Sequence, residues 1–394
     1  MLSRIEGLFS EEKSFDLNNY GYNLVVDAWA RSRNPGREMK ARAVIDRMVK
    51  LAAETGNKTL LPDKLTYTCL INAIIADRQK GFEDRCAEIL SMMVTGNDRI
   101  KADQIAYNSV VKAYSLARKP EKAEMTFRRM EDAGISPNFW CYNNVLNAYA
   151  KSQSKDSAQK TIEILEKMEA SGIEPPPISY AICIDALGRS EDTIRVRRAE
   201  ELVERSIRKS KSSKHQSQET VVPIFNALQS VYIRSDEPNK VQKTLGVIKL
   251  MEENGLTPDI VSYNSVLSAC SRLPPNIDEK LRRNAIEIAA KVVEFLRSDA
   301  SLSPDSQSYN SLLWVCNDIS DEIEKRQTIQ AVFQMCCKDG LLSRHFLGTL
   351  KQVAGHQFFQ LVGRERGHVD ISELDPSWSR NANSGQVSRN KYKK

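Results

Sequence analysis

Apolar residues in this chain follow helical spacing in short stretches, and the stretches come in pairs. In the clearest pair, the first stretch has apolar residues at i, i+3, i+4 and i+7, which predicts one buried face of a helix. These residues are Tyr107, Val110, Val111 and Tyr114. After Lys119-Pro120 interrupts the pattern, Ala123, Phe127 and Met130 form the stripe of a second helix. The pattern therefore predicts pairs of amphipathic helices joined by short turns.

The same pair of stretches recurs along the chain. Each first stretch contains an aromatic anchor, usually followed by Asn. The anchor dipeptides are Tyr22-Asn23, Tyr67-Thr68, Tyr107-Asn108, Tyr142-Asn143, Tyr180-Ala181, Phe225-Asn226, Tyr263-Asn264 and Tyr309-Asn310. They are spaced by 45, 40, 35, 38, 45, 38 and 46 residues. Such a period is typical of solenoids, because a single helix pair can bury its stripes only by stacking on its neighbours.

Recurring residues also mark the junctions between units. A second stretch ends in Met-xxx-Gly at Met130 with Gly134, and again at Met168 and Met251. Glycine is expected there because it adopts the left-handed conformation that ends a helix most easily. A Pro-Asp or Pro-Asn step then precedes the next first stretch. These steps are Pro62-Asp63, Pro137-Asn138, Pro258-Asp259 and Pro304-Asp305.

The junctions predict an all-α chain with four parts. Residues 1–18 are expected to be the end of a preceding repeat's second helix. Eight repeats are expected at 19–63, 64–103, 104–138, 139–176, 177–221, 222–259, 260–305 and 306–344. Residues 345–379 are expected to cap the apolar face of the last repeat, and the Asn-, Ser- and Lys-rich residues 380–394 to form a disordered basic tail.

Charge and hydropathy narrow the choice of partners. The net charge is +6, but the tail contributes five basic residues and no acidic one, so residues 1–379 carry only +1. The tail residues are Arg380, Arg389, Lys391, Lys393 and Lys394. Composition alone therefore does not indicate a nucleic-acid partner. No apolar run approaches the ~18 residues that span a bilayer, so no membrane partner is expected.

No catalytic or metal-binding pattern is visible. The eight cysteines and four histidines lack the paired spacing of a zinc site, so we expect reduced, buried thiols in an intracellular compartment. There is no Gly-rich phosphate loop, deaminase signature or cluster of acidic residues. The acidic residues among the first 18 also argue against a transit peptide in this chain. The sequence predicts no enzyme, no cofactor and no metal.

The repeated segments resemble pentatricopeptide repeats. The resemblance rests on Gln104 to Val111 with Met130 to Asn138, and on Thr257 to Leu267, and covers about residues 19–344. Tetratricopeptide repeats are less similar because they lack the Pro-Asp and Tyr-Asn junction. The resemblance implies a right-handed superhelical α-solenoid, of the pure repeat type, that binds single-stranded RNA at about one base per repeat.

The Asn after the anchor is unusual, because Asn is less favourable than Ala inside a helix by roughly 0.5 kcal/mol. One interpretation is a hydrogen bond between repeats that fixes their stacking. The other, implied by the resemblance, is base reading by this residue together with the last residue of the repeat. The base-reading residues would be Asn23, Asp63, Thr68, Asp103, Asn108, Asn138, Asn143, Asn226, Asp259, Asn264, Asp305 and Asn310. For the Asp and Asn residues that end repeats, helix capping is the alternative role.

The resemblance also implies RNA contacts at two further positions of each repeat. Residues two before the anchor would sandwich each base: Tyr20, Leu65, Ile105, Trp140, Ile178 and Val261. Pro223 and Gln307 depart from this pattern. Cations nine residues after the anchor would meet phosphates: Arg31, Lys151, Arg189, Arg234 and Arg272. The alternative for these cations is a solvated helix end.

Two classes of function follow. The first is sequence-selective binding of single-stranded RNA for RNA processing, stability or translation in a mitochondrion or plastid, an assignment of organelle that rests on the resemblance. The second is a protein-protein scaffold, for example a subunit associated with an organellar ribosome. Partners of the first class would be single-stranded RNA and other proteins of an RNA-processing or ribosomal complex.

Overall fold

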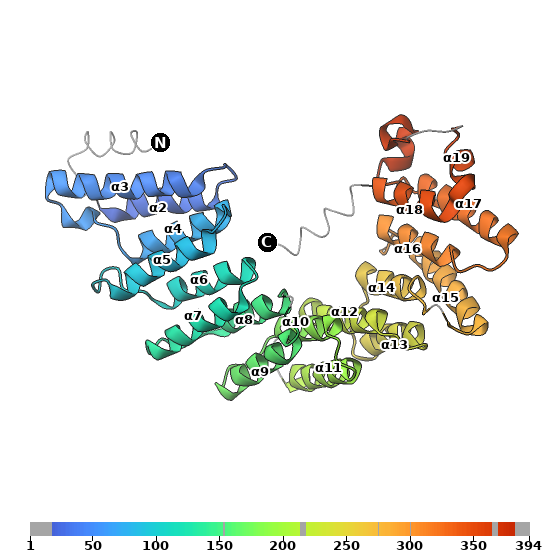
Figure 1. Ribbon diagram of the computed structural model, residues 1–394, viewed down its shortest axis with the longest axis horizontal. Helices are drawn as coiled ribbons and strands as arrows, with labels where there is room; N and C mark the ends of the chain where they lie inside the picture. The colour runs from blue at the N-terminus through green and yellow to red at the C-terminus, as the bar shows by residue number, and fades with distance from the viewer. Residues whose placement is uncertain are drawn as a thin grey trace. The chain divides into compact units, whose positions relative to one another are not determined.

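The computed structural model of the protein describes residues 18–152, 154–212, 218–274, 276–299, 301–364 and 369–382. The expectations for residues 1–17 and 383–394 lie outside the described residues. The chain divides into two compact units, Met1–Ala186 and Leu187–Lys394, called the N-terminal and C-terminal units here. In its described part the chain forms helices and no strand (Figure 1).

The N-terminal unit is a row of helix pairs. Its elements are α2 (Asn19–Arg31), α3 (Arg37–Thr55), η1 (Lys58–Leu60), α4 (Lys64–Asp77), α5 (Phe82–Thr95), α6 (Gln104–Leu116), α7 (Pro120–Asp132), α8 (Phe139–Ala150) and α9 (Ser157–Ala170). First helices pack on one another in order, α2 on α4, α4 on α6 and α6 on α8. Each intervening second helix contacts the first helix before it and the first helix after it. Helix α10 (Pro177–Arg189) spans the boundary between the units.

The C-terminal unit continues the same arrangement. Its helices are α11 (Arg195–Ser212), α12 (Gln218–Arg234), α13 (Lys240–Glu253), α14 (Ile260–Cys270), α15 (Glu279–Ser298), α16 (Ser306–Cys316), α17 (Glu322–Lys338) and α18 (Arg344–Ala354). Short elements follow: η2 (Gly355–Gln357), α19 (Phe358–Leu361), η3 (Ile371–Glu373) and η4 (Pro376–Ser379). The first helices again stack in order, α12 on α14, α14 on α16 and α16 on α18. Both units are thus all-α helical-repeat solenoids.

Local sequence explains where the first helices begin. Asp63, Asp103, Asn138, Asp259 and Asp305 each cap the following helix, accepting hydrogen bonds from backbone N–H groups of its first turn. Such caps satisfy donors that the helix itself leaves unpaired. The capping role expected for the residues that end repeats is therefore present at these junctions.

Glycines end several second helices in the left-handed conformation. Gly134 has φ of 72°, and no atom lies within 4 Å of where its Cβ would be. We expect Gly134→Ala to lower the free energy of unfolding by about 1 kcal/mol through backbone strain alone. Gly246, inside α13, has equally open surroundings and no such φ. Gly246→Ala should raise the free energy of unfolding by about 0.5 kcal/mol or more. Urea unfolding measures both variants, and equal effects of Gly134→Ala and Gly246→Ala would contradict the left-handed conformation assigned to Gly134.

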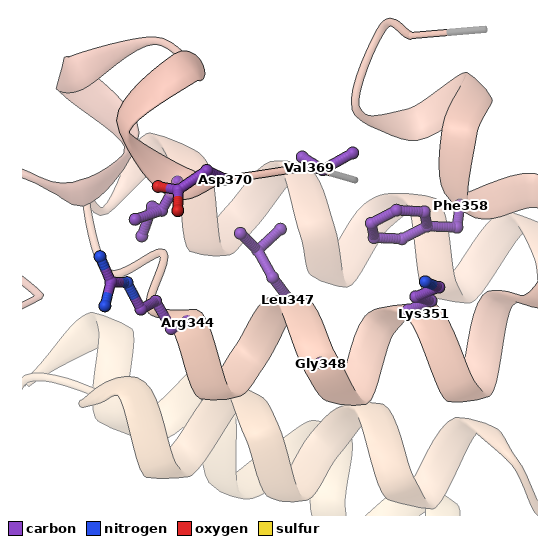
Figure 2. Close-up of a pocket in the computed structure, with 8 residues that line it drawn as sticks. Arg344, Leu347, Gly348, Lys351, Phe358, Val369 and Asp370 are labelled. Atoms are coloured by element: carbon purple, nitrogen blue, oxygen red, sulfur yellow. The ribbon is translucent and has the colours of Figure 1, made fainter. Parts of the chain in front are cut away.

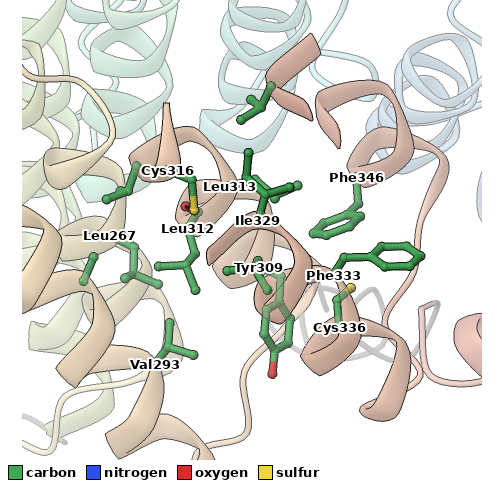
Figure 3. Packing of buried hydrophobic residues seen from close by; sticks show 14 of the residues in the cluster. Leu267, Val293, Tyr309, Leu312, Leu313, Cys316, Ile329, Phe333, Cys336 and Phe346 are labelled. Atoms are coloured by element: carbon green, nitrogen blue, oxygen red, sulfur yellow. Dashed lines mark hydrogen bonds between the residues drawn. The ribbon is translucent and has the colours of Figure 1, made fainter. Parts of the chain in front are cut away.

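The core of the C-terminal unit lies between the two layers of helices. Tyr309, the anchor of α16, is completely buried in a cluster with Leu313, Phe333 and Phe346 (Figure 3). Its hydroxyl donates a hydrogen bond to Asp339, which also pairs with Arg297. Burial and this carboxylate raise the pKa of Tyr309 above its usual range. The anchor therefore joins the apolar core of one repeat to the end of its second helix.

The C-terminal boundary differs from the expectation. We expected the last repeat to end at 344, but Ser343 is the N-cap of α18, accepting a hydrogen bond from the Phe346 N–H at 3.1 Å. Helix α18 packs on α16 as α16 packs on α14, so the region expected at 345–379 begins with a ninth first helix. The residues beyond it do cover the last pair, since Trp378 packs edge-on against Phe333 at 5.6 Å.

The outer face of α18 is partly charged, with Arg344 and Lys351 on either side of the buried Leu347. Arg344, Gly348 and Lys351 line a cavity of about 370 Å³, with Asp370 across it (Figure 2). Lys351 lies eight residues after its N-cap, where α16 has the fully buried Leu313. A polar outer face is typical of the terminal unit of a solenoid. Within the described residues, the row of first helices therefore ends at α18.

The start of the sixth repeat also differs from the expectation. Helix α12 begins at Gln218, four residues before the expected start of the sixth repeat at 222. Pro223 accordingly lies inside the helix rather than at its first turn. The expected start was too late because every repeat was taken to begin three residues before its aromatic anchor, whereas α12 extends further back from Phe225 than the other first helices do from theirs.

Candidate nucleic-acid interface

Each expected reading pair lies where a first helix meets the next repeat. In the N-terminal unit, the Asn23 amide donates to the Asp63 carboxylate at 3.2 Å, and its carbonyl oxygen accepts from the Thr66 hydroxyl at 2.5 Å. Thr66 in turn accepts from the Asp63 N–H at 3.0 Å. The three residues form a closed set of hydrogen bonds across the junction, which we call a junction ring.

The C-terminal unit contains two more junction rings. Asn264 donates to Asp305 at 3.1 Å and accepts from Ser308 at 2.6 Å, while Ser308 accepts from the Asp305 N–H at 3.0 Å. In the other ring, Asn226 donates to Asp259 at 3.3 Å and accepts from Ser262 at 2.7 Å. The Asp259 N–H closes that ring to the Ser262 hydroxyl at 3.4 Å.

The junction ring fixes which way the amide faces. Burial raises the pKa of Asp63, but hydrogen bonds from Thr66, Asn23 and Asn19 outweigh it and hold that pKa below its usual range. The carboxylate is therefore ionised and accepts only, so the amide nitrogen and not the carbonyl oxygen must face it. The ring uses one of the two amide N–H donors, and one N–H remains.

The reading Asn residues are more buried than a groove-lining residue would need to be. Asn23 is 4% exposed and Asn264 is 3% exposed. The interpretation that these residues fix repeat stacking is supported, because their bonds cross from one repeat to the next. Base reading through the remaining N–H is compatible with those bonds.

For two other expected reading pairs, Thr68 with Asp103 and Asn108 with Asn138, the structure gives no hydrogen bond between the two members. Thr68 donates to the backbone carbonyl of Lys64 at 2.7 Å rather than to Asp103. Asn108 accepts from the Asn144 amide at 2.8 Å rather than pairing with Asn138. Asn138 instead donates to Gln104 at 2.9 Å.

Repeats four and eight also depart from the ring. Asn143 accepts from the Ser179 hydroxyl at 2.6 Å, but Pro176 stands where the ring has Asp. Asn310 lies 3.2 Å from the His345 ring nitrogen Nε2 and makes no contact of this kind with Arg344, the residue expected to end its repeat. Ser343 takes the junction position there, so Arg344 is not the second residue of the eighth pair.

The hydroxyl residue of the ring was missed at the sequence level. Thr66, Ser179, Ser262 and Ser308 each stand one residue before an aromatic anchor and are fully buried. A recurring Thr-Tyr or Ser-Tyr dipeptide is the signal that could have revealed them. Its partner, however, lies in the preceding repeat, so spacing within one repeat does not show the contact.

The positions expected to sandwich bases are exposed and apolar, as a row of five in the N-terminal unit and at one position in the C-terminal unit. In the N-terminal unit Tyr20, Leu65, Ile105, Trp140 and Ile178 are 48–65% exposed, and in the C-terminal unit Val261 is 46% exposed. Large apolar side chains left in water at the same helical position indicate a binding surface. The Trp140 ring also packs on Phe139, with 4.6 Å between centroids, which holds the indole in place.

The five expected phosphate contacts are all at the surface. Arg31, Lys151, Arg189, Arg234 and Arg272 are exposed at the ends of their first helices. Arg31 is paired with Asp27 at 2.7 Å, so its charge is already partly compensated. An exposed pair of this kind contributes little to stability and is easily exchanged for a phosphate.

The described residues contain no group of three or more His, Cys, Asp or Glu side chains that could hold a metal ion. All eight cysteines are buried and free. Burial raises the pKa of Cys86 and of Cys183 to about 12, so these thiols stay protonated and are poor nucleophiles. No described helix is long and apolar enough to span a membrane.

Comparison with known proteins shows which family the repeats resemble. A family model described as "Pentatricopeptide repeat domain" matches residues 89–152 and 222–272. A chloroplastic pentatricopeptide repeat-containing protein of Arabidopsis thaliana is 26% identical over 237 residues, covering 59% of this chain and 28% of the relative. A second Arabidopsis thaliana protein of this kind is 23% identical over 227 residues, covering 57% of this chain and 36% of the relative.

A mitochondrial Arabidopsis thaliana relative is 28% identical over 90 residues, or 23% of this chain and 18% of that protein. This chain thus spans about a third or less of the length of these relatives. Among solved structures, the pentatricopeptide repeat protein PPR10 in complex with an 18-nt psaJ RNA element is 18% identical, with 99% of this chain and 53% of that chain covered and a TM-score of 0.48. Residues 89–152 and 222–272 are thus pentatricopeptide repeats by the matched family model, and the chain is similar to pentatricopeptide repeat-containing proteins over more than half of its length.

Proposed function

We propose that this protein binds single-stranded RNA sequence-selectively, at about one base per repeat, and acts by binding rather than by catalysis. The observation that carries the proposal is one arrangement that repeats along the N-terminal unit and recurs at Val261 and Asn264 in the C-terminal unit. Exposed apolar side chains stand at the position that would stack on bases, and a hydrogen-bonded Asn or its equivalent stands three residues later. Base stacking contributes about 1–3 kcal/mol per base without regard to sequence, whereas amide groups can discriminate base edges.

The site of action proposed is a mitochondrion or plastid, in RNA processing, stability or translation. The support is that related proteins are named chloroplastic and mitochondrial. A protein-protein scaffold on the same surface is the competing function, and the RNA-binding experiment below distinguishes the two.

The pairing rules that the resemblance implies give a preferred sequence. Asn with Asp favours U, which applies to Asn23, Asn226 and Asn264 with their partners. Thr68 with Asp103 favours G, and Asn108 with Asn138 favours a pyrimidine. Repeats four and five fit no rule and should be indifferent. The proposed core is 5′-U-G-Y-N-N-U-U-3′, and selection from a randomised RNA pool tests it.

The experiment that tests RNA binding is filter binding across a salt series. Changing Arg189, Arg234 and Arg272 together to Gln should weaken binding to all sequences alike. It should also flatten the slope of log affinity against log salt by up to about 2 units, because roughly 0.7 counterions are released per phosphate contact on a single strand.

The matched control replaces three exposed lysines of second helices in the same unit, Lys249, Lys280 and Lys291, with Gln. This triple variant loses the same charge but should keep the wild-type slope. Absence of single-stranded RNA binding at low salt, or binding that ignores salt, would rule out the proposed function and leave the scaffold. A loss confined to one RNA sequence would show that the three arginines read bases.

A further inference from the structure

The hydroxyl of each junction ring cannot touch RNA itself. Thr66, Ser262 and Ser308 have no measurable exposure, so each can affect a bound base only through a residue that it contacts, and the Asn of the preceding repeat is such a residue. In that contact the hydroxyl donates its one hydrogen to the Asn carbonyl oxygen at 2.5–2.7 Å. The same hydroxyl is 2.9–3.1 Å from the Asp carboxylate, so the Asn oxygen is the closer acceptor in every ring.

Places where the hydroxyl is missing show what it does. Phe346 stands at that position after Asn310, and the Asn310 carbonyl oxygen is buried without a hydrogen-bond partner among the described residues. Cys141 stands there after Asn108, whose carbonyl oxygen is turned to Asn144 instead. An amide held by a donor on its oxygen and an acceptor on its nitrogen has one orientation, whereas an amide lacking one of them can turn over.

We propose that the buried hydroxyl one residue before each aromatic anchor is a specificity-determining positioning residue for the base read by the preceding repeat. It holds the Asn amide so that its remaining N–H, and not its carbonyl oxygen, is offered to the base edge. The inference rests on the proposed RNA-binding function. It assigns Thr66 to the base of repeat one, Ser262 to that of repeat six and Ser308 to that of repeat seven. Ser179 makes the same bond to Asn143, but Pro176 supplies no carboxylate there, so the Asn143 amide is held on its oxygen alone and repeat four is expected to stay indifferent.

This assignment crosses repeat boundaries, which gives it a distinctive signature. Ser308 belongs to the eighth repeat but controls the seventh base, because its hydroxyl contacts Asn264. A residue that merely stabilised its own helix would change the base preference at neighbouring nucleotides by similar amounts. Thr66 forms the same bond as the serines, so threonine is the conservative replacement that should preserve the effect.

The experiment measures base preference in full-length Ser308→Ala and Ser308→Thr. The nucleotide read by Asn264 is first identified as the one whose preference changes in Asn264→Thr. At that nucleotide, Ser308→Ala should reduce the affinity ratio between the best and worst base by about fivefold, the equivalent of one net hydrogen bond. Ser308→Thr should restore the wild-type ratio, and the preference at the next nucleotide should be unchanged in both variants.

Ser308 also takes part in capping α16, so further variants separate the two roles. Ser343→Ala removes the N-cap of α18, a bond from the Phe346 N–H, and should leave every base ratio unchanged because the structure gives Ser343 no hydrogen bond to a reading Asn. Ser262→Ala should lower the ratio only at the nucleotide facing Asn226. Unchanged ratios in Ser308→Ala and Ser262→Ala, or equal losses at every nucleotide, would overturn the inference while RNA binding stood. A wild-type protein that bound no RNA would overturn the proposed function, and this inference with it.

Discussion

Phe346→Ala is expected to lower the free energy of unfolding of the C-terminal unit by about 3–5 kcal/mol, as is usual for deleting a fully buried aromatic ring. Phe346 has no exposed surface and lies in the same buried cluster as Phe333 and Leu313 (Figure 3). The cost arises because the ring joins α18 to the last helix pair, and the surrounding side chains can close only part of the cavity. Urea unfolding followed by circular dichroism measures it.

The control is Gln352→Ala on the same helix, where the side chain is exposed. Its effect should stay within about 0.5 kcal/mol. If Phe346→Ala cost less than 1 kcal/mol, α18 would be a loosely attached cap and not a stacked first helix. The result therefore decides how the C-terminal end of the solenoid is built.

The repeat architecture could be predicted from the sequence because its signals are local. A stripe such as Tyr107 to Tyr114 defines a helix and its buried face, and Asp103 marks where that helix begins. Stacking then follows from the need to bury each stripe. The expected helix starts at Lys64, Gln104, Phe139 and Ile260 match the first residues of α4, α6, α8 and α14.

The ninth first helix was hidden because its residues break the pattern. Leu347-Gly348 stands in α18 where most other first helices have an aromatic residue and Asn, and Ser343 stands where most of them have Asp or Asn. The helix is recognised only by its contacts with α16. Buried apolar area, supplied here by Phe346 and Leu350, replaces the missing anchor.

The candidate site was predicted in part. Residue types at fixed positions identified the Asn and Asp of the junction ring, and the exposed rows at Tyr20 and Trp140 agree with the expected surface. The hydroxyl that completes the ring was not predicted, because a contact between different repeats depends on how they stack. The Thr68 bond is a different case, because its hydroxyl returns to the carbonyl four residues earlier in its own helix, a local alternative to base reading that was not predicted.

Trp140→Ala is expected to weaken single-stranded RNA binding by about 5- to 150-fold, whatever the base that faces it. The indole is 58% exposed and is braced by Phe139, so it offers a preformed surface whose stacking on a base contributes about 1–3 kcal/mol. Fluorescence anisotropy with labelled RNAs that differ at the facing nucleotide measures the loss. Trp140→Tyr should retain most of the affinity because it keeps an aromatic face.

Met125→Ala is the control, since Met125 is 49% exposed but lies on the second helix α7, away from the expected surface. Equal losses in Trp140→Ala and Met125→Ala would indicate nonspecific apolar binding, and a loss seen with only one facing base would make Trp140 a base reader rather than a stacking platform.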